Sequence, residues 1–257
     1  MRRRTLLFGT VVALVAMALP GSALAANPGA GSCSGGIMAT GTYSGFTVTG
    51  TCTIAPGANV QINGNLFVAK GASLDDHGLE AYRAAQLHVT GNVIVGKGAV
   101  LGLGYNAAPG TLGPDTVGGN IIADQPLALQ VGNVTVGGNL ISVGGGVLST
   151  SAADFRNFPV KDNVIHGNLI LQGWRGGWLG VIRDHVDGNV IVANIVSLSS
   201  GAGPGTDPDS TEVQTNNVGG NLICFGNSPA AQVNPGDGGL PNTVGGHAIG
   251  QCAGLTQ

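Results

Sequence analysis

The chain is poor in charge and in aromatic side chains. Charged residues make up 9% of the 257 residues and aromatic residues 4%, and the formal net charge is −3 at pH 7. Disordered chains combine low hydrophobicity with high net charge, so this composition argues against disorder. A nucleic-acid partner requires a basic face, and the slight negative charge offers none. We therefore expect a folded protein that does not bind nucleic acid.

Long apolar runs are also scarce, because only the N-terminal end has one. Three arginines at 2–4 precede this run, and an Ala-Leu-Ala sequence at 23–25 follows it. The arrangement is typical of a secretory signal peptide, of either the general or the twin-arginine kind. The run is short for a bilayer, which takes about 20 residues to cross. The sequence predicts a signal peptide at 1–25, a single domain at 26–257 and no membrane attachment after cleavage. It predicts a protein that is secreted or loosely associated with the cell wall.

Cysteine is limited to four residues, which form two local couples. Cys33 and Cys52 lie near one end, and Cys224 and Cys252 lie near the other. Three pairings are possible, and an exported chain favours disulfides. Local pairing closes short loops, each bridge contributing about 3 kcal/mol by loop entropy. No C-x-x-C couple is present, so zinc is disfavoured, and we predict the two local bridges.

Glycine, in contrast, is abundant, with 47 residues, and much of it belongs to an internal repeat. Each copy has Val or Ile, then any residue, then Gly-Asn, then two or three small or aliphatic residues. The asparagine of successive copies is Asn65, Asn92, Asn120, Asn139, Asn168, Asn189 and Asn221, and His247 takes its place in an eighth copy. Successive copies are 19 to 32 residues apart, which indicates a unit near 20 residues that carries inserts.

Short apolar strands punctuated by glycine at a repeating unit are typical of a parallel β-solenoid. One unit can wrap three short strands around a narrow core, and each strand pairs with its equivalent about 4.8 Å away. We expect the glycine to supply a positive φ at a corner, a geometry that asparagine also tolerates. Stacked asparagine side chains can bond from coil to coil. The prediction is an all-β fold of about eight coils, with disulfides stapling the terminal coils.

The same register predicts an apolar column on the outer surface. If the residues one and three after the asparagine point inward, the residue two after it points outward. That outward set is Phe67, Ile94, Ile122, Ile141, Ile170, Ile191, Ile223 and Ile249. A continuous exposed apolar column is an interaction surface, although loops covering it or the opposite register would remove it.

The C-terminal sequence carries a resemblance to a known group. "VGGNLICFGNSPAAQV" and the closing "GQCAGL" resemble the C-terminal region of secreted, glycine-rich proteins of actinobacterial type, which repeat "VGGN". The resemblance implies a right-handed β-helix that is exported and has no assigned activity. His247 departs from the asparagine that this group carries. More remotely, the repeats resemble those of bactofilins, a likeness that concerns packing alone.

The long inserts between copies are where chemistry is expected, because solenoids carry function on loops. One insert holds Asp75, Asp76, His77 and Glu80, and another contains "DPDSTE" with Asp207, Asp209 and Glu212. Such acidic clusters can serve acid–base catalysis or calcium binding, but solvated loops are the favoured interpretation. No nucleophile motif and no phosphate loop are present, so no catalytic residue, metal site or cofactor is predicted.

The two tryptophans lie close together in "WRGGW", with "IRDH" just after. Tryptophan and arginine are common anchors for sugars and protein partners. Candidate ligand-binding residues are therefore Trp174, Arg175, Trp178, Arg183, Asp184 and His185. The alternative is a cap that packs over a widened coil.

Three functions remain open on the sequence alone. The favoured one is a secreted structural or surface-interaction protein that is not an enzyme and binds the cell envelope or further copies of itself. The second is a module that binds cell-wall or extracellular polysaccharide. The third is a β-helical polysaccharide lyase or hydrolase, which requires Asp75, Glu80, Asp184 and Asp187 to gather on one face.

Overall fold

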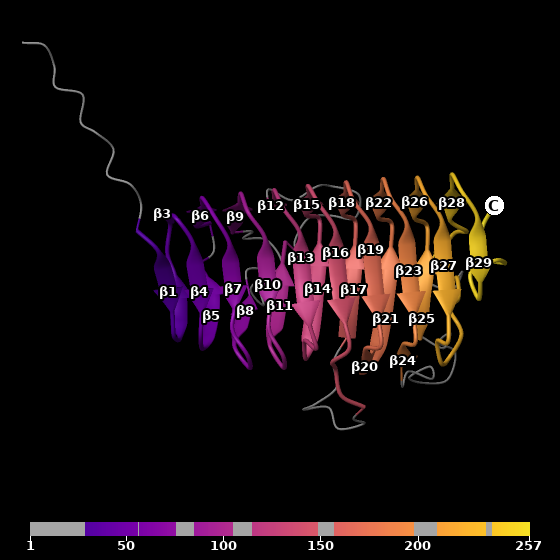
Figure 1. Cartoon of the computed structure of the whole chain (residues 1–257), viewed down its shortest axis with the longest axis horizontal. Helices are drawn as coiled ribbons and strands as arrows, with labels where there is room; N and C mark the ends of the chain where they lie inside the picture. The colour runs from indigo at the N-terminus through magenta and orange to yellow at the C-terminus, as the bar shows by residue number, and fades with distance from the viewer. Residues whose placement is uncertain are drawn as a thin grey trace, which may run out of the picture.

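The structure is a computed structural model that describes residues 29–55, 57–75, 85–104, 115–148, 157–197, 210–234 and 238–257. These residues form short parallel strands joined by tight corners, and none of them is helical. The coils stack along the long axis of the molecule (Figure 1). The predicted signal peptide at 1–25 lies outside the described residues. The predicted all-β parallel solenoid is confirmed.

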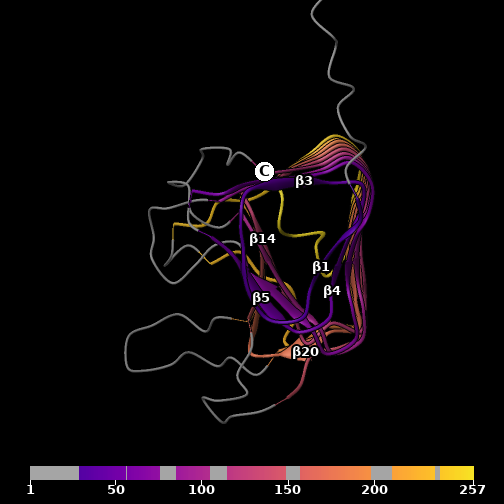
Figure 2. The same cartoon turned by 90° about the vertical axis from the view of Figure 1, so that its left-hand side faces the viewer.

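The coils contribute strands to three parallel sheets, which we call A, B and C, and Figure 2 looks along the stack. Sheet A contains β1 (Gly31–Cys33), β4 (Phe46–Val48), β7 (Leu66–Val68), β10 (Val93–Val95), β13 (Ile121–Asp124), β16 (Leu140–Val143), β19 (Leu169–Gln172), β23 (Val190–Ala193), β27 (Leu222–Phe225) and β29 (Ala248–Gly250). Sheet B contains β2 (Gly36–Met38), β5 (Thr51–Ile54), β8 (Ser73–Asp75), β11 (Val100–Leu103), β14 (Ala128–Gly132), β17 (Asn157–Lys161), β21 (Trp178–Ile182) and β25 (Thr211–Gln214).

Sheet C closes the coil on its third side. It contains β3 (Gly41–Tyr43), β6 (Asn59–Ile62), β9 (Gln86–Val89), β12 (Thr116–Val117), β15 (Thr135–Val136), β18 (Val164–Ile165), β22 (His185–Val186), β26 (Asn217–Val218) and β28 (Thr243–Val244). A separate pair, β20 (Arg175–Gly176) with β24 (Val196–Ser197), widens two coils between sheets A and B. Sheet A has ten strands, so two coils at the N-terminal end lack the asparagine motif from which we predicted about eight.

The core is a narrow column of aliphatic side chains that alternate along each strand. In β10, Val93 and Val95 are buried and Ile94 between them points outward, as predicted from the register. β-Branched residues suit this arrangement, because they pack well on a pleated surface that is buried on one side. The inward positions one and three after each asparagine therefore build the core.

The glycine before each ladder asparagine is required for a different reason from the one predicted. It has no positive φ in any copy, and neither has the asparagine. A Cβ placed on Gly119 would lie 2.6 Å from Oδ1 of Asn92 and 2.8 Å from the carbonyl oxygen of Gly91. The prediction of a left-handed corner here is wrong, and the glycine instead lets two successive coils approach closely.

The left-handed residues lie at the other two corners of the coil. Between sheets B and C, residues that are not glycine adopt φ values of 57° to 60°, and these are Asn133, Asp162, Arg183 and Thr215. Between sheets A and B, glycines such as Gly71, Gly98 and Gly144 take the same conformation at 68° to 69°. L-residues pay a modest steric penalty in this region, so these corners explain part of the glycine content.

The predicted asparagine ladder is confirmed along the motif corner. The backbone N–H of each motif residue from Asn92 to His247 donates to Oδ1 of the asparagine one coil earlier, at 2.8 to 2.9 Å. The Nδ2 group of each asparagine from Asn92 to Asn221 donates to the same oxygen, at 3.0 to 3.4 Å. His247 fits the last place because its role there needs only the backbone N–H.

Both ends of the core are closed by residues of the terminal coils. The predicted disulfides Cys33–Cys52 and Cys224–Cys252 are confirmed. At the N-terminal end, the rings of Tyr43 and Phe46 pack edge to face with centroids 4.8 Å apart. At the C-terminal end, the tail folds back, and Asn242 donates its backbone N–H to the carbonyl oxygen of Leu255. The described terminal coils thus shield the two ends of the hydrophobic core.

Candidate functional site

The outward apolar column of sheet A runs from the third coil to the last. Strand register places its eight members in one line, in which each residue pairs with the equivalent residue of the neighbouring strand. The line is Phe67, Ile94, Ile122, Ile141, Ile170, Ile191, Ile223 and Ile249. Thr47 of β4 continues the line as a polar residue toward the N-terminal end. We call these eight residues the apolar column.

Three members of the apolar column are exposed to solvent, and two further exposed apolar residues lie beside it. Phe67 is 42% exposed, Ile122 38% and Ile249 47%, and the other five members are half-buried by their neighbours. Two residues further along the strands, Val143 and Phe225 are also exposed. A continuous line of eight apolar residues on one face is a larger apolar patch than the single, scattered apolar residues of ordinary protein surfaces. The opposite register does not hold for these residues, because the positions one and three after the asparagine are the ones buried in strands such as β10 and β19.

Trp174 lies in the core and does not reach a ligand. Its side chain is 1% exposed and packs edge to face on Phe158, with ring centroids 5.2 Å apart. The ring fills the space that β20 and β24 open between sheets A and B. A Cβ on Gly176 would collide with this ring, so the glycine makes room for it. The alternative of packing in a widened coil is the one that the structure supports for Trp174.

The other candidate ligand-binding residues are not gathered into one site. Trp178 is half-buried on the outer face of sheet B, where Nζ of Lys161 lies 5.1 Å from its ring centroid. Arg175 is exposed on β20, between sheets A and B. Arg183 belongs to the corner between sheets B and C and donates to both carboxylate oxygens of Asp162, each at 2.7 Å.

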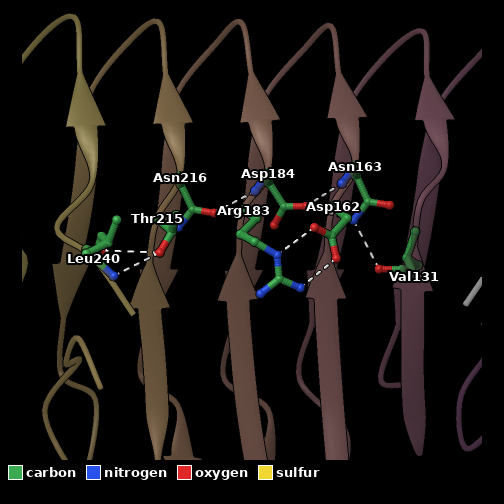
Figure 3. A network of polar contacts seen from close by, with 8 residues as sticks. All are labelled: Val131, Asp162, Asn163, Arg183, Asp184, Thr215, Asn216 and Leu240. Atoms are coloured by element: carbon green, nitrogen blue, oxygen red, sulfur yellow. Dashed lines mark hydrogen bonds and ion pairs between the residues drawn. The ribbon is translucent and has the colours of Figure 1, made fainter. Parts of the chain in front are cut away.

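A second ladder, which sequence reasoning missed, lies inside the corner between sheets B and C (Figure 3). Its members are Asn163, Asp184, Asn216 and Asn242, all fully buried. The backbone N–H of each of the first three donates to Oδ1 of the next, at 2.9 to 3.0 Å. The signal in the sequence is an Asn or Asp five residues before the motif asparagine or His247, a position that Asp115 also occupies.

Asp184 is the one carboxyl among these four members. Its Oδ1 accepts from the backbone N–H and from Nδ2 of Asn163, at 2.9 and 2.8 Å. Its Oδ2 is buried and has no hydrogen-bond partner among the described residues. Burial raises the pKa of Asp184 from 3.8 to about 7, although the hydrogen bonds from Asn163 and the charge of Arg183 oppose the rise. Asp184 is therefore inaccessible to a ligand, but its raised pKa and its unpartnered buried oxygen set it apart from an ordinary aspartate.

His185 points away from Asp184 and forms an exposed cluster on the outer surface. Oδ2 of Asp187 lies 2.8 Å from Nδ1 of His166, and Oδ1 lies 3.0 Å from Nε2 of His185. The hydrogen bond from His166 lowers the pKa of Asp187. All three side chains are exposed, so solvent screens this cluster and its contribution to stability is small.

The carboxylates required for a lyase or hydrolase do not share a face. Asp75 ends β8 on the outer surface of sheet B, Asp184 is buried, and Asp187 is exposed at the corner between sheets C and A. Asp76, His77, Glu80, Asp207 and Asp209 lie outside the described residues. Within the described ranges, no three His, Cys, Asp or Glu side chains are grouped to hold a metal ion. Nor does any helix there have the length and apolar character to cross a bilayer.

Comparison with protein-family models, with curated proteins and with solved structures finds no match to this chain. Of the features described above, the apolar column is the one that extends over most of the molecule and faces solvent.

Proposed function

We propose that the protein is an exported structural protein whose copies associate side by side through sheet A. The observation that carries the proposal is the apolar column, which stays in register over eight strands and is exposed at Phe67, Ile122 and Ile249. Export through residues 1–25 is part of the proposal. It is supported by the two disulfides, since such bonds persist in oxidising surroundings.

A second copy is the partner that the column fits best. Its rungs repeat at the strand spacing of about 4.8 Å, and another copy presents apolar rungs at the same spacing. Two such faces can interdigitate along their whole length, whereas a partner of different period would lose register after a few rungs. The capped ends described above favour contact along the side over contact end to end.

The size of the face sets the strength of the association. Seven intervals of about 4.8 Å give a length of about 34 Å, and two outward positions that each occupy about 7 Å give a width of about 14 Å, so the strip is on the order of 500 Å² per copy. Stable complexes bury about 800 Å² per partner, and smaller interfaces are transient. We therefore expect a reversible, concentration-dependent association, which is strengthened when many copies are held on one surface.

The double substitution Ile141→Lys and Ile170→Lys should abolish this association. It places two charges at the centre of the column, where a partner copy would bury them at a high desolvation penalty. Sedimentation velocity over a range of concentrations is the measurement. The wild-type sedimentation coefficient should rise with concentration, and that of the double variant should stay at the monomer value.

A matched control carries the same charges on another face. Thr116→Lys with Thr135→Lys adds two lysines in register on the outer side of sheet C. This pair should sediment like the wild type. A wild type that stays monomeric at all concentrations, or a control as monomeric as the sheet A pair, would contradict the proposal.

A further inference from the structure

The buried ladder has a fixed pattern of donors and acceptors. The side-chain amide of Asn216 donates to Oδ1 of Asn242 at 2.8 Å and to the carbonyl oxygen of Val181 at 2.9 Å. Asn163 repeats the pattern toward Asp184 and Val131, at 2.8 and 3.0 Å. Each amide therefore ties its coil to the next ladder member and to a valine carbonyl of the preceding coil.

Asp184 occupies the place between these two asparagines but has no amide hydrogens. Sheet B register aligns Val131, Val160 and Val181, so the valine carbonyl facing the Asp184 position is that of Val160. The next ladder oxygen is Oδ1 of Asn216, which already accepts the backbone N–H of Asp184 at 2.9 Å. Oδ2 of Asp184 thus stands where an amide nitrogen would stand, and its nearest counterparts by register are two acceptor oxygens.

An ionised carboxylate is unsuited to this place, because it would set a third acceptor against two others in a buried site. A neutral carboxyl has a hydroxyl that can donate to one of them. We propose that Asp184 holds a proton on Oδ2 and works as a substitute for asparagine, so that the joint between its coil and the two adjoining coils tightens in acid and loosens when the proton leaves.

The groups around Asp184 are consistent with such a joint. The neighbouring ladder members are amides, and the buried sheet A residues of its own coil and the next, Leu171 and Val192, are apolar. The charged groups that act on Asp184 are Asp162, which favours the neutral form, and Arg183, which opposes it. Those two form an ion pair with each other, in which the Asp162 side chain is only 8% exposed, and their effects on Asp184 oppose each other. Burial remains the main cause of the raised pKa.

The sign of the pH dependence follows from linkage. Because the native carboxyl keeps its proton to a higher pH than the unfolded one, unfolding releases a proton between pH 4 and 7, roughly from 3.8 up to the native pKa of about 7. The stabilising effect of the proton is full in acid, declines as the pH rises through this window and is absent above it. The unfolding equilibrium constant rises up to about tenfold per pH unit within the window.

Chemical unfolding of the wild type and of Asp184→Asn from pH 4 to 8 tests the proposal. The unfolding constant of the wild type divided by that of the variant should rise with pH across the window, because the variant has lost this titration. The ratio should level off near pH 7. Asp124→Asn makes the same chemical change on the exposed end of β13, and its profile should follow the wild type.

A measurement on the wild type alone guards against a variant that fails to fold. With carbon-13 in the aspartate carboxyls, one resonance should titrate near pH 7. In protein that folds with Asp184→Asn, that resonance should be missing. Parallel unfolding profiles for wild type and Asp184→Asn, or carboxyl resonances that all titrate below pH 5, would overturn the proposal.

Discussion

Replacing Gly138 with alanine should destabilise the solenoid by about 3 kcal/mol, the upper range for overpacking at a site that cannot relax. The new Cβ would lie 2.5 Å from Oδ1 of Asn120 and 2.9 Å from the carbonyl oxygen of Gly119. Both oxygens belong to the preceding coil and are fixed by hydrogen bonds to Asn139 and to Gly138 itself. Relief of the clash therefore requires two coils to separate. Urea unfolding followed by circular dichroism measures the loss.

Gly45→Ala provides the matched control for this change. Gly45 also has no positive φ, and the nearest atom to its added Cβ is the carbonyl oxygen of Asn65 at 3.6 Å, an ordinary contact. We expect its unfolding midpoint to stay close to that of the wild type. If both variants were equally stable, or if Gly138→Ala were tolerated, close approach would not be the reason for glycine in the motif.

Replacing Trp174 with alanine should lower the free energy of unfolding by about 3 to 5 kcal/mol, the usual range for deleting a buried tryptophan. The side chain is fully buried against Phe158, and the cavity it leaves is held open by β20 and β24. The expected result is a clear drop in the thermal midpoint. The far-ultraviolet spectrum at low temperature should keep its β character, because distant coils do not contact this site.

Trp178→Ala is the comparison for that prediction, since it removes the same side chain from a half-buried position beneath Lys161. Its effect on the midpoint should be the smaller of the two. The pair also separates packing from recognition. If Trp174→Ala left stability unchanged while weakening binding to a polysaccharide, the buried role assigned to Trp174 would be wrong.

The repeat was sufficient to predict the coil, because the coil depends on a pattern that recurs along the chain, and the spacing of the four cysteines was sufficient to predict both disulfides. Conformation at single corners was harder. The glycine at position 119 is compatible both with a positive φ and with close approach of two backbones, and the residue type alone does not distinguish these two roles. The structure assigns close approach to Gly119 and left-handed geometry to residues such as Asp162, which carry no obvious signal.

The predicted binding cluster had a different weakness. Trp174 and Trp178 are near in sequence, but an added strand between them turns one ring into the core and the other outward. The buried ladder was overlooked because its position holds Asn in some copies and Asp in others, and Val134 interrupts it. Asp184 looked like a surface residue in "RDH", and only the strand register reveals that it replaces an amide.

The asparagine ladder also bears on how a chain of this kind changes its length over evolutionary time. Each ladder asparagine presents the same Oδ1 acceptor to the next coil, so the ladder hydrogen bonds of a coil depend only on the adjacent coil. The 19 residues from Ile121 to Asn139 span one interval, and their removal would join Asn120 directly to Leu140 and restore the motif. Duplication of such an interval preserves the ladder hydrogen bonds across the junction. Coils can therefore be added or removed as units, and selection can change the length of the solenoid without changing the packing of its core.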